Sequence, residues 1–137
     1  MDRTLVICKP DAVERGLVGE IIGRLERKGL QLVAAELRQI DVETAGRHYE
    51  EHQRKSFFGD LVIFVTRSPS LLMVVEGPED TWKVVRDLMG ATNPREAAPG
   101  TIRGDLGIEV TENLVHGSDG PDSAKREIDL FFPGLGL

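Results

Sequence analysis

The 137-residue chain carries 17 lysine and arginine residues against 23 aspartate and glutamate residues, and this net charge of −6 argues against a general nucleic-acid or anionic-membrane surface. Hydrophobic residues make up 40% of the chain, so its length predicts one domain over residues 1–137 with a substantial core. Without a membrane-length apolar run or a recognisable signal peptide, and with Cys8 unable to form an internal disulfide, we expect a cytoplasmic protein.

The first part of the chain predicts two strands separated by helical segments. Residues 4–9, which include the apolar run from Leu5 to Cys8, predict a buried strand. Asp11 followed by Glu14 is a weak capping-box signal for a short helical turn. Apolar residues then recur at helical spacing over residues 18–25, and residues 30–40 predict a second strand.

The middle of the chain contains one ambiguous segment. Residues 42–54 predict a polar helix, whereas residues 57–66 have the composition of a strand and the apolar spacing of a helix. Residues 71–76 predict a strand that ends at a Gly-Pro pair. Residues 79–89 predict a helix whose apolar face includes Trp82, so we expect this side chain in the core.

The last part predicts a long irregular loop over residues 91–107, a strand over residues 112–116 and a helix over residues 122–132. Loops of this length in small domains are functional or disordered. The alternation of strands and helices favours an α+β sandwich with helices on one face of the sheet.

No glycine-rich phosphate loop or dinucleotide-binding signature occurs in the sequence. A phosphate site would therefore be built from side chains that are far apart in the chain. Lys9, Arg86, Thr92 and Arg103 are the candidates. Each alone is typical of a solvated surface residue, but together they could clamp an anion.

A second candidate site is the segment from His48 to His52, which matches the H-x-x-E-H pattern of inverted zinc peptidases with Glu51 as the base. A catalytic zinc ion normally needs a third protein ligand, and none is evident in the sequence. A five-residue match on an acidic helix also arises easily by chance, so we do not favour a metal site.

The stretch from Asn113 to Asp119, N-L-V-H-G-S-D, places His116 between a strand and a turn of small residues. Histidine titrates near neutral pH and can act as a nucleophile or a base. An isolated V-H-G tripeptide is more often an ordinary turn, so His116 needs support from the rest of the chain.

That support comes from the other motifs. Lys9-Pro10-Asp11, R-G-L-V-G-E-I over residues 15–21, His48-Tyr49, Phe57-Phe58, Thr92-Asn93-Pro94, P-G-T-I-R-G-D over residues 99–105 and N-L-V-H-G-S-D resemble the nucleoside diphosphate kinase family in order and spacing. The resemblance covers essentially the whole chain. It implies a ferredoxin-like α+β sandwich with a four-stranded antiparallel sheet covered by helices, and it favours a helix over residues 57–66.

The resemblance also implies an activity. Enzymes of this family transfer the terminal phosphoryl group of a nucleoside triphosphate to a nucleoside diphosphate. By resemblance, His116 is the nucleophile of a ping-pong reaction and Glu127 orients its ring. Broad base specificity is expected, and Mg²⁺ is expected to arrive bound to the nucleotide phosphates rather than to a carboxylate cage.

The family assigns the remaining roles. The phosphates are expected to contact Lys9, Arg86, Thr92 and Arg103, and the terminal phosphoryl group to contact Tyr49, with His48 behind it. The sugar hydroxyls are expected to contact Asn113 and Lys9. The base is expected to stack on Phe57 near Val110, and Gly117 and Ser118 are expected to shape the turn after His116.

Some positions depart from the family pattern. Ala12 replaces a usual glycine, Ser56 replaces a proline, and residues 67–70 differ from the common Ser-Gly-Pro turn. The C-terminal tail over residues 132–137 is short, which leaves the oligomer open between hexamer and tetramer, with a hexamer favoured. A nucleotide-binding regulatory module without catalysis is the alternative function, and the complete set of polar residues favours the enzyme.

Overall fold

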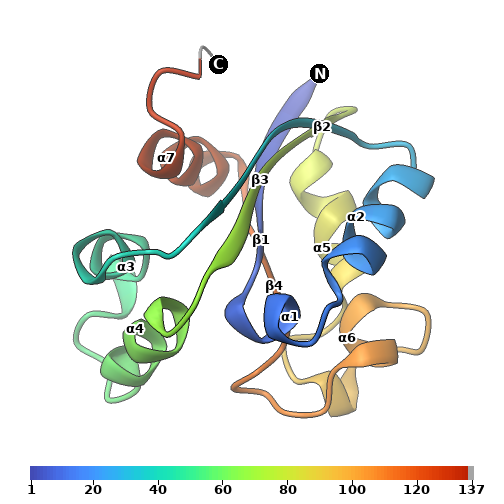
Figure 1. Cartoon of the computed structure of the whole chain (residues 1–137). Helices are drawn as coiled ribbons and strands as arrows, with labels where there is room; N and C mark the ends of the chain where they lie inside the picture. The colour runs from blue at the N-terminus through green and yellow to red at the C-terminus, as the bar shows by residue number, and fades with distance from the viewer. Residues whose placement is uncertain (136–137) are drawn as a thin grey trace.

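The computed structural model describes residues 1–135 and is built around a four-stranded antiparallel sheet (Figure 1). The strands are β1 (Asp2–Cys8), β2 (Gln31–Arg38), β3 (Ser70–Gly77) and β4 (Val115–Gly117), and their order across the sheet is β2-β3-β1-β4. The antiparallel sheet confirms the expected ferredoxin-like fold.

Helices cover both faces of the sheet, so the expectation of helices on one face was wrong. One face is covered by α1 (Pro10–Glu14), α2 (Val18–Arg27), α5 (Thr81–Met89) and α6 (Ile102–Leu106), and the other by α3 (Val42–His48), α4 (Phe58–Thr66) and α7 (Pro121–Phe131) (Figure 1).

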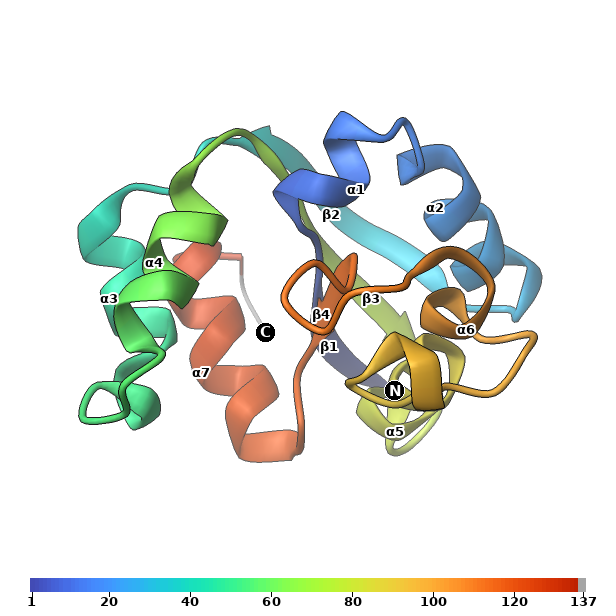
Figure 2. The same ribbon diagram turned by 90° about the horizontal axis from the view of Figure 1, so that it is seen from below.

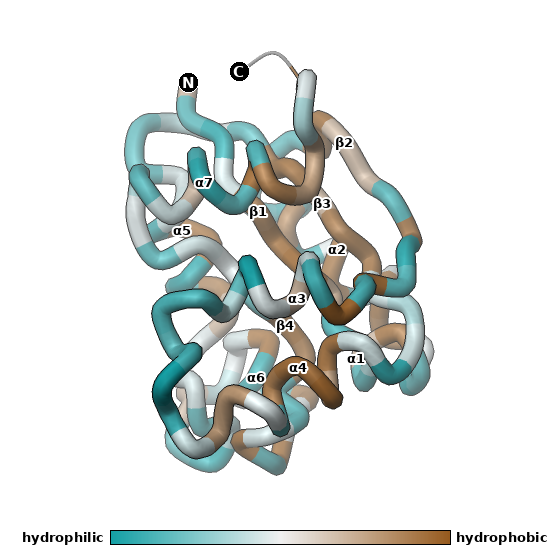
Figure 3. The backbone as a smooth tube through the Cα atoms, turned by 90° about the vertical axis from the view of Figure 1, so that its left-hand side faces the viewer, coloured by the Kyte–Doolittle hydropathy of each residue, from teal (hydrophilic) through white to brown (hydrophobic). Residues whose placement is uncertain are grey.

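The physical reason is that β1 is apolar on both sides. Val6 and Cys8 enter the core beneath α2 and α5, whereas Leu5 and Ile7 enter the core beneath α7. Figure 3 shows the same pattern, with hydrophobic residues running continuously along β1 and β3. A strand that alternates between two buried faces has no polar side to expose to water.

The ambiguous segment 57–66 is a helix, as the resemblance implied, because Val62 and Val65 pack into the core at helical spacing. The polar helix expected over residues 42–54 is shorter: α3 ends at His48 and a 3₁₀ turn, η1 (Glu50–His52), follows. No helix within residues 1–135 is long and apolar enough to cross a membrane.

The segment 91–107 is not an irregular loop throughout. It contains a 3₁₀ turn, η2 (Pro94–Glu96), and the helix α6. Thr101 caps α6 by accepting a hydrogen bond from the Gly104 amide at 3.0 Å. Glycines at 100, 104 and 107 masked this short helix because they suggest a loop in the sequence.

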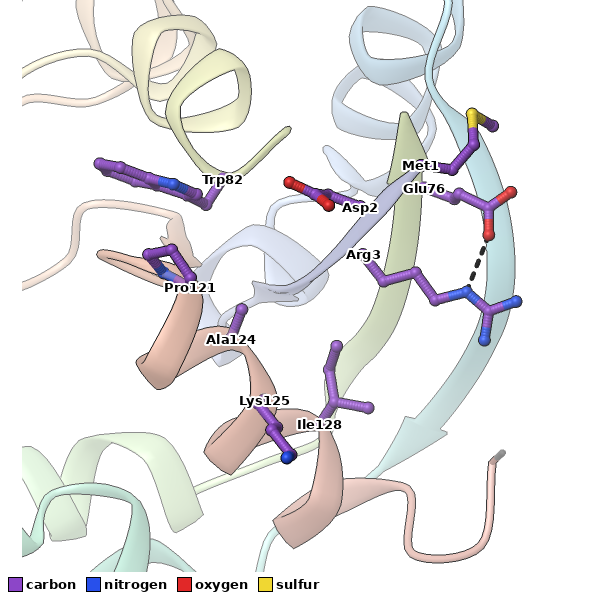
Figure 4. Close-up of a pocket in the computed structure, with 9 residues that line it drawn as sticks. All are labelled: Met1, Asp2, Arg3, Glu76, Trp82, Pro121, Ala124, Lys125 and Ile128. Atoms are coloured by element: carbon purple, nitrogen blue, oxygen red, sulfur yellow. Dashed lines mark hydrogen bonds and ion pairs between the residues drawn. The ribbon is translucent and has the colours of Figure 1, made fainter. Parts of the chain in front are cut away.

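Trp82 is only partly buried, so the expectation that it lies in the core was also wrong. Its indole lies beside Pro121 and Ala124 at a surface cavity of about 530 Å³ between α5, α7 and the start of β1 (Figure 4). Cys8 is fully buried as expected, and burial raises the pKa of its thiol to about 12, so it is not a nucleophile at neutral pH.

Candidate active site

A cavity of about 660 Å³ opens beside β4, and every site residue predicted from the sequence lines it except Ser118, which is fully buried. Figure 2 shows β4 with α3, α4 and α7 on one side and α6 on the other, so the cavity collects residues from distant parts of the chain. The predicted residues are Lys9, His48, Tyr49, Phe57, Arg86, Thr92, Arg103, Val110, Asn113, His116, Gly117 and Glu127. The cavity near Trp82 holds none of them.

His116 on β4 is held by Glu127 on α7. Its Nε2–H donates to Glu127 Oε1 at 2.9 Å, and the Ser118 hydroxyl donates to the same oxygen at 2.6 Å. Burial alone would raise the pKa of Glu127, but the hydrogen bonds from His116 and Ser118 bring it down to about 2. The carboxylate is therefore ionised at neutral pH and fixes the His116 tautomer with the proton on Nε2.

The close approach of α5 to β4 depends on Gly117. A Cβ atom at this position would lie 2.6 Å from the Met89 sulfur and 3.2 Å from Val85 Cγ1, so any larger residue would force these side chains of α5 to shift. From the same helix, Arg86 donates to the Gly117 carbonyl oxygen at 3.2 Å. This packing places a cation beside the residue that follows His116.

His48 is a buried neutral base behind His116. Burial and the neighbouring His116 lower the pKa of His48 to about 3. The two imidazole rings meet edge to face with centroids 4.6 Å apart, and His48 Nδ1 lies 3.8 Å from Glu127 Oε2. Tyr49 lies against His48 with centroids 4.6 Å apart, and burial raises the pKa of its hydroxyl to about 12, so this group keeps its proton and can donate a hydrogen bond.

Lys9 and Arg103 form the cationic wall of the cavity, with Arg86 close to Arg103. Burial and the charge of Arg103 lower the pKa of Lys9 to about 8, and burial and the charge of Arg86 lower that of Arg103 to about 10. Three cations that share a cavity repel one another, so an anion that enters is strongly favoured.

Arg103 also has a structural role that the sequence did not indicate. Its guanidinium donates to the carbonyl oxygens of Asn113 at 3.1 Å, Gly90 at 3.1 Å and Val115 at 2.7 Å. These bonds occupy Nε and both terminal nitrogens, so the side chain ties the segment before His116 to the end of α5. Only its remaining N–H groups are available to a phosphate.

Asn113 forms hydrogen bonds with two other residues that are expected to contact the ligand. Its Oδ1 accepts from Lys9 Nζ at 2.9 Å, and its side-chain nitrogen donates to the Thr92 carbonyl oxygen at 3.0 Å. The segments that carry Lys9, Thr92 and Asn113 therefore meet through one amide group, which places their polar atoms at the same wall of the cavity.

At the mouth of the cavity, Phe57 and Val110 are exposed to 44% and 51%. The exposed ring of Phe57 therefore presents a face that an aromatic base could cover. Sequence reasoning missed Phe64, which lines the same cavity with its ring centroid 6.0 Å from Lys9 Nζ, because it appeared only as an apolar residue of the ambiguous segment.

The histidines do not form the zinc site that the H-x-x-E-H pattern suggested. α3 ends at His48, and His52 lies on η1, where its Nδ1 contacts Lys55 Nζ at 3.0 Å. Within residues 1–135, the group whose ligand atoms could reach one metal ion is instead His48, His116 and Glu127, with all three atoms within 4.8 Å of one another. Two of these residues already bond to each other, as described above.

Comparison with known proteins settles what this arrangement belongs to. The sequence profile of nucleoside diphosphate kinase matches residues 2–136. The chain belongs to the nucleoside diphosphate kinase family. It is 58% identical over 134 residues to the nucleoside diphosphate kinase of Parafrankia sp. (strain EAN1pec), covering 98% of this chain and 97% of that protein. The corresponding enzyme of Archaeoglobus fulgidus is 61% identical over 132 residues, which is 96% of this chain and 87% of that protein.

Solved structures of nucleoside diphosphate kinases have the same fold. The structure of a halophilic member from Halobacterium salinarum in complex with CDP superposes with a TM-score of 0.93 at 52% identity, covering 96% of this chain and 88% of that one. A member from Babesia bovis also superposes with a TM-score of 0.93, at 46% identity over 97% of this chain and 89% of that one. The chain is therefore an enzyme of the nucleotide phosphotransfer class.

Proposed function

We propose that this member of the nucleoside diphosphate kinase family transfers the terminal phosphoryl group through a phosphohistidine at His116. The observation that carries the proposal is the bond between His116 Nε2–H and the ionised Glu127. Because the proton sits on Nε2, the lone pair of Nδ1 is available to attack phosphorus.

The reaction has two halves. In the first, Nδ1 forms a bond to the terminal phosphorus, the bond from that phosphorus to the bridging oxygen breaks, and the nucleoside diphosphate leaves with the electron pair. In the second, a terminal oxygen of another nucleoside diphosphate attacks the same phosphorus and the P–N bond breaks. A P–N bond suits this exchange because it is high enough in energy to pass the group on, whereas a phosphoserine is not.

The cationic wall provides the charge stabilisation. We assign Lys9, Arg86, Thr92 and Arg103 to the phosphates and to the charge of the transferring group. The protonated hydroxyl of Tyr49 is assigned to the terminal phosphoryl group, with His48 supporting it from behind.

The nucleoside is bound at the opposite end of the cavity. Asn113 and Lys9, which already share a hydrogen bond, are assigned to the sugar hydroxyls. The base stacks on Phe57 beside Val110, and stacking accepts any base because every base has a π-face. Broad base specificity follows.

Mg²⁺ enters as part of the substrate, bound to the nucleotide phosphates. Within the part of the chain that the structure describes, no group of three or more carboxylates gathers that could hold the ion alone, and Glu127 is committed to His116 and Ser118. We further propose that the whole chain acts as one cytoplasmic domain and assembles into a homo-oligomer, with a hexamer favoured over a tetramer.

The test is covalent labelling. Incubation with Mg²⁺ and ATP labelled in the terminal phosphate should give a phosphoprotein that is labile in acid and stable in base. The variant His116→Ala should lose both the label and the turnover, whereas Val42→Ala, on the exposed face of α3, should keep both. A labelled, active His116→Ala enzyme would exclude the mechanism, and nucleotide binding without any label in the native chain would indicate a binding module instead.

A further inference from the structure

The backbone makes a strained turn two residues before His116. Leu114 has a φ of +74°, and the Val115 amide donates to the Asn113 carbonyl oxygen at 2.8 Å, which closes a three-residue γ-turn. A bulky side chain at positive φ is rare and unfavourable, so such a turn persists only when its surroundings hold it.

A buried carboxylate on another element holds this turn. Asp11 Oδ2, on α1, accepts a hydrogen bond from the Leu114 amide at 3.1 Å, and the Lys9 amide donates to the Leu114 carbonyl oxygen at 2.9 Å. Asp11 is 1% exposed, and 103 residues separate it from Leu114 in sequence. The short helical turn predicted from Asp11 and Glu14 is present as α1, although the Asp11 side chain does not cap it.

The turn lies between two residues of the active site. Asn113, which begins the turn, bonds through Oδ1 to Lys9 Nζ at 2.9 Å, and His116 follows the turn by one residue on β4. Asp11 itself is not among the described residues that line the cavity, so it does not contact a ligand there. It can influence the reaction through the backbone of the turn and through its charge, which acts on Lys9 and Arg103.

We propose that Asp11 is a positioning residue for phosphoryl transfer: its carboxylate holds the strained γ-turn at Leu114 and so sets the positions of Asn113, Lys9 and His116. This inference rests on the proposed role of His116 as the nucleophile. A carboxylate suits the task because it offers only acceptors, and its bond to a backbone N–H is stronger than a neutral one. Its other oxygen, Oδ1, is buried without a hydrogen-bond partner in residues 1–135. Burying an unpaired oxygen costs free energy, so an apolar residue would suit this position better if packing were its only role.

The first experiment compares the rates of phosphoenzyme formation, measured by rapid quench with labelled ATP and Mg²⁺, for the native enzyme, Asp11→Asn and Asp11→Ala. Asp11→Ala should slow the step about 100-fold, because a displacement of about 1 Å at a reacting group costs about that factor. Asp11→Asn keeps an oxygen acceptor and should slow it less than about tenfold. An Asp11→Ala enzyme that is phosphorylated at the native rate would overturn the proposal.

A second experiment separates positioning from general stability. Leu114→Ala and Leu114→Gly both remove the buried side chain, but only glycine adopts a positive φ without strain. Asp11→Ala should therefore cost at least about tenfold less in the Leu114→Gly background than in the Leu114→Ala background. Equal costs in the two backgrounds would show that Asp11 supports folding and not the turn.

The third measurement does not depend on the folding of Asp11→Ala or on catalysis. The Leu114 amide proton should resonate downfield in the native protein and move upfield in Asp11→Asn, because the bond to a charged acceptor is lost. An unchanged resonance would contradict the contact. If the native enzyme forms no phosphoprotein, the nucleophile assignment fails, whereas this resonance still reports on Asp11 and the turn.

Discussion

Glu127 Oε1 lies 2.9 Å from His116 Nε2. This contact joins α7, the last helix of the fold, to the short strand β4, which pairs with β1. Replacement by Glu127→Gln keeps the size of the side chain but allows the amide to present either an oxygen or an NH₂ group to the ring. The tautomer with a free Nδ1 is then no longer enforced, and the rate of phosphoenzyme formation should fall about 10-fold to 100-fold.

Ser118→Ala is the matched control for this prediction. It removes the hydroxyl that donates to Glu127 Oε1 at 2.6 Å but leaves the bond to His116 in place, so its loss in rate should be less than about tenfold. Equal rates for native enzyme and Glu127→Gln in stopped-flow fluorescence or rapid quench would refute the orienting role of Glu127.

Lys9 should make nucleotide affinity fall above pH 8. Burial and the charge of Arg103 lower the pKa of Lys9 to about 8, so the ammonium group is present below this pH and is lost above it. The Kd for ADP, measured by calorimetry between pH 6.5 and pH 9.5, should rise as Lys9 loses its proton. Lys9→Gln should bind weakly throughout and show a flatter profile, and a variant profile as steep as the native one would assign the effect to another group.

The low pKa of His48 should make the folded protein less stable as the pH falls. Its pKa is about 3 in the folded protein, because of burial and the neighbouring His116, against 6.5 in an unfolded chain. Between these values the unfolded chain holds a proton that the folded protein excludes, so the free energy of unfolding decreases as pH falls from 6.5 towards 3. The contribution from this residue is at most about 1.4 kcal/mol per pH unit.

Urea unfolding of the native protein and His48→Asn at pH 7, 6, 5 and 4.5 measures this effect. The free energy of unfolding of His48→Asn should decline less steeply with falling pH, because an amide does not titrate. A second variant, His48→Gln, should show the same change in slope, since the cause is the missing titration and not the new shape. Parallel slopes for all three proteins would rule out a buried neutral His48.

The sequence predicted which residues meet at the cavity far better than it predicted the contacts that hold them there. Motif residues such as His116 and Asn113 have recognisable neighbours in the chain, and the cavity collects them as the resemblance implied. The contact of Asp11 with Leu114 could not be predicted, because it depends on a positive φ and on a partner 103 residues away. In the sequence, Asp11 appeared as a weak helix-capping signal and as part of the Lys9-Pro10-Asp11 motif, and neither indicated this contact.

The fold, too, could be predicted from the sequence only in part. Strand and helix positions follow from local periodicity, but the number of covered sheet faces depends on which residues of β1 meet which helix. The run from Leu5 to Cys8 is apolar throughout and was compatible with a sheet buried on both faces, whereas the order of elements alone suggested one covered face. The helix α6 was hidden by its glycines and depends on the Thr101 cap.

Arg103 should contribute more to stability than Arg86 does. Arg103→Lys loses the planar fork that donates to three backbone carbonyl oxygens, and we expect a loss of about 3 kcal/mol in the free energy of unfolding without nucleotide. Arg86→Lys loses one bond, to the Gly117 carbonyl oxygen, and should cost about 1 kcal/mol. Urea denaturation of both variants decides the comparison, and equal losses would contradict the structural role of Arg103.

Phe57 should strengthen the binding of every nucleotide by a similar amount. Its ring is 44% exposed at the mouth of the cavity, where a base can cover it. Phe57→Ala should weaken the binding of ADP, GDP, CDP and UDP by about 1–3 kcal/mol each, because stacking uses the π-face that all bases share. Val42→Ala, which changes an apolar side chain exposed to 67% away from the cavity, should leave the four affinities unchanged. A loss confined to purines or to pyrimidines would show that Phe57 discriminates between bases, which excludes the broad specificity proposed for this site.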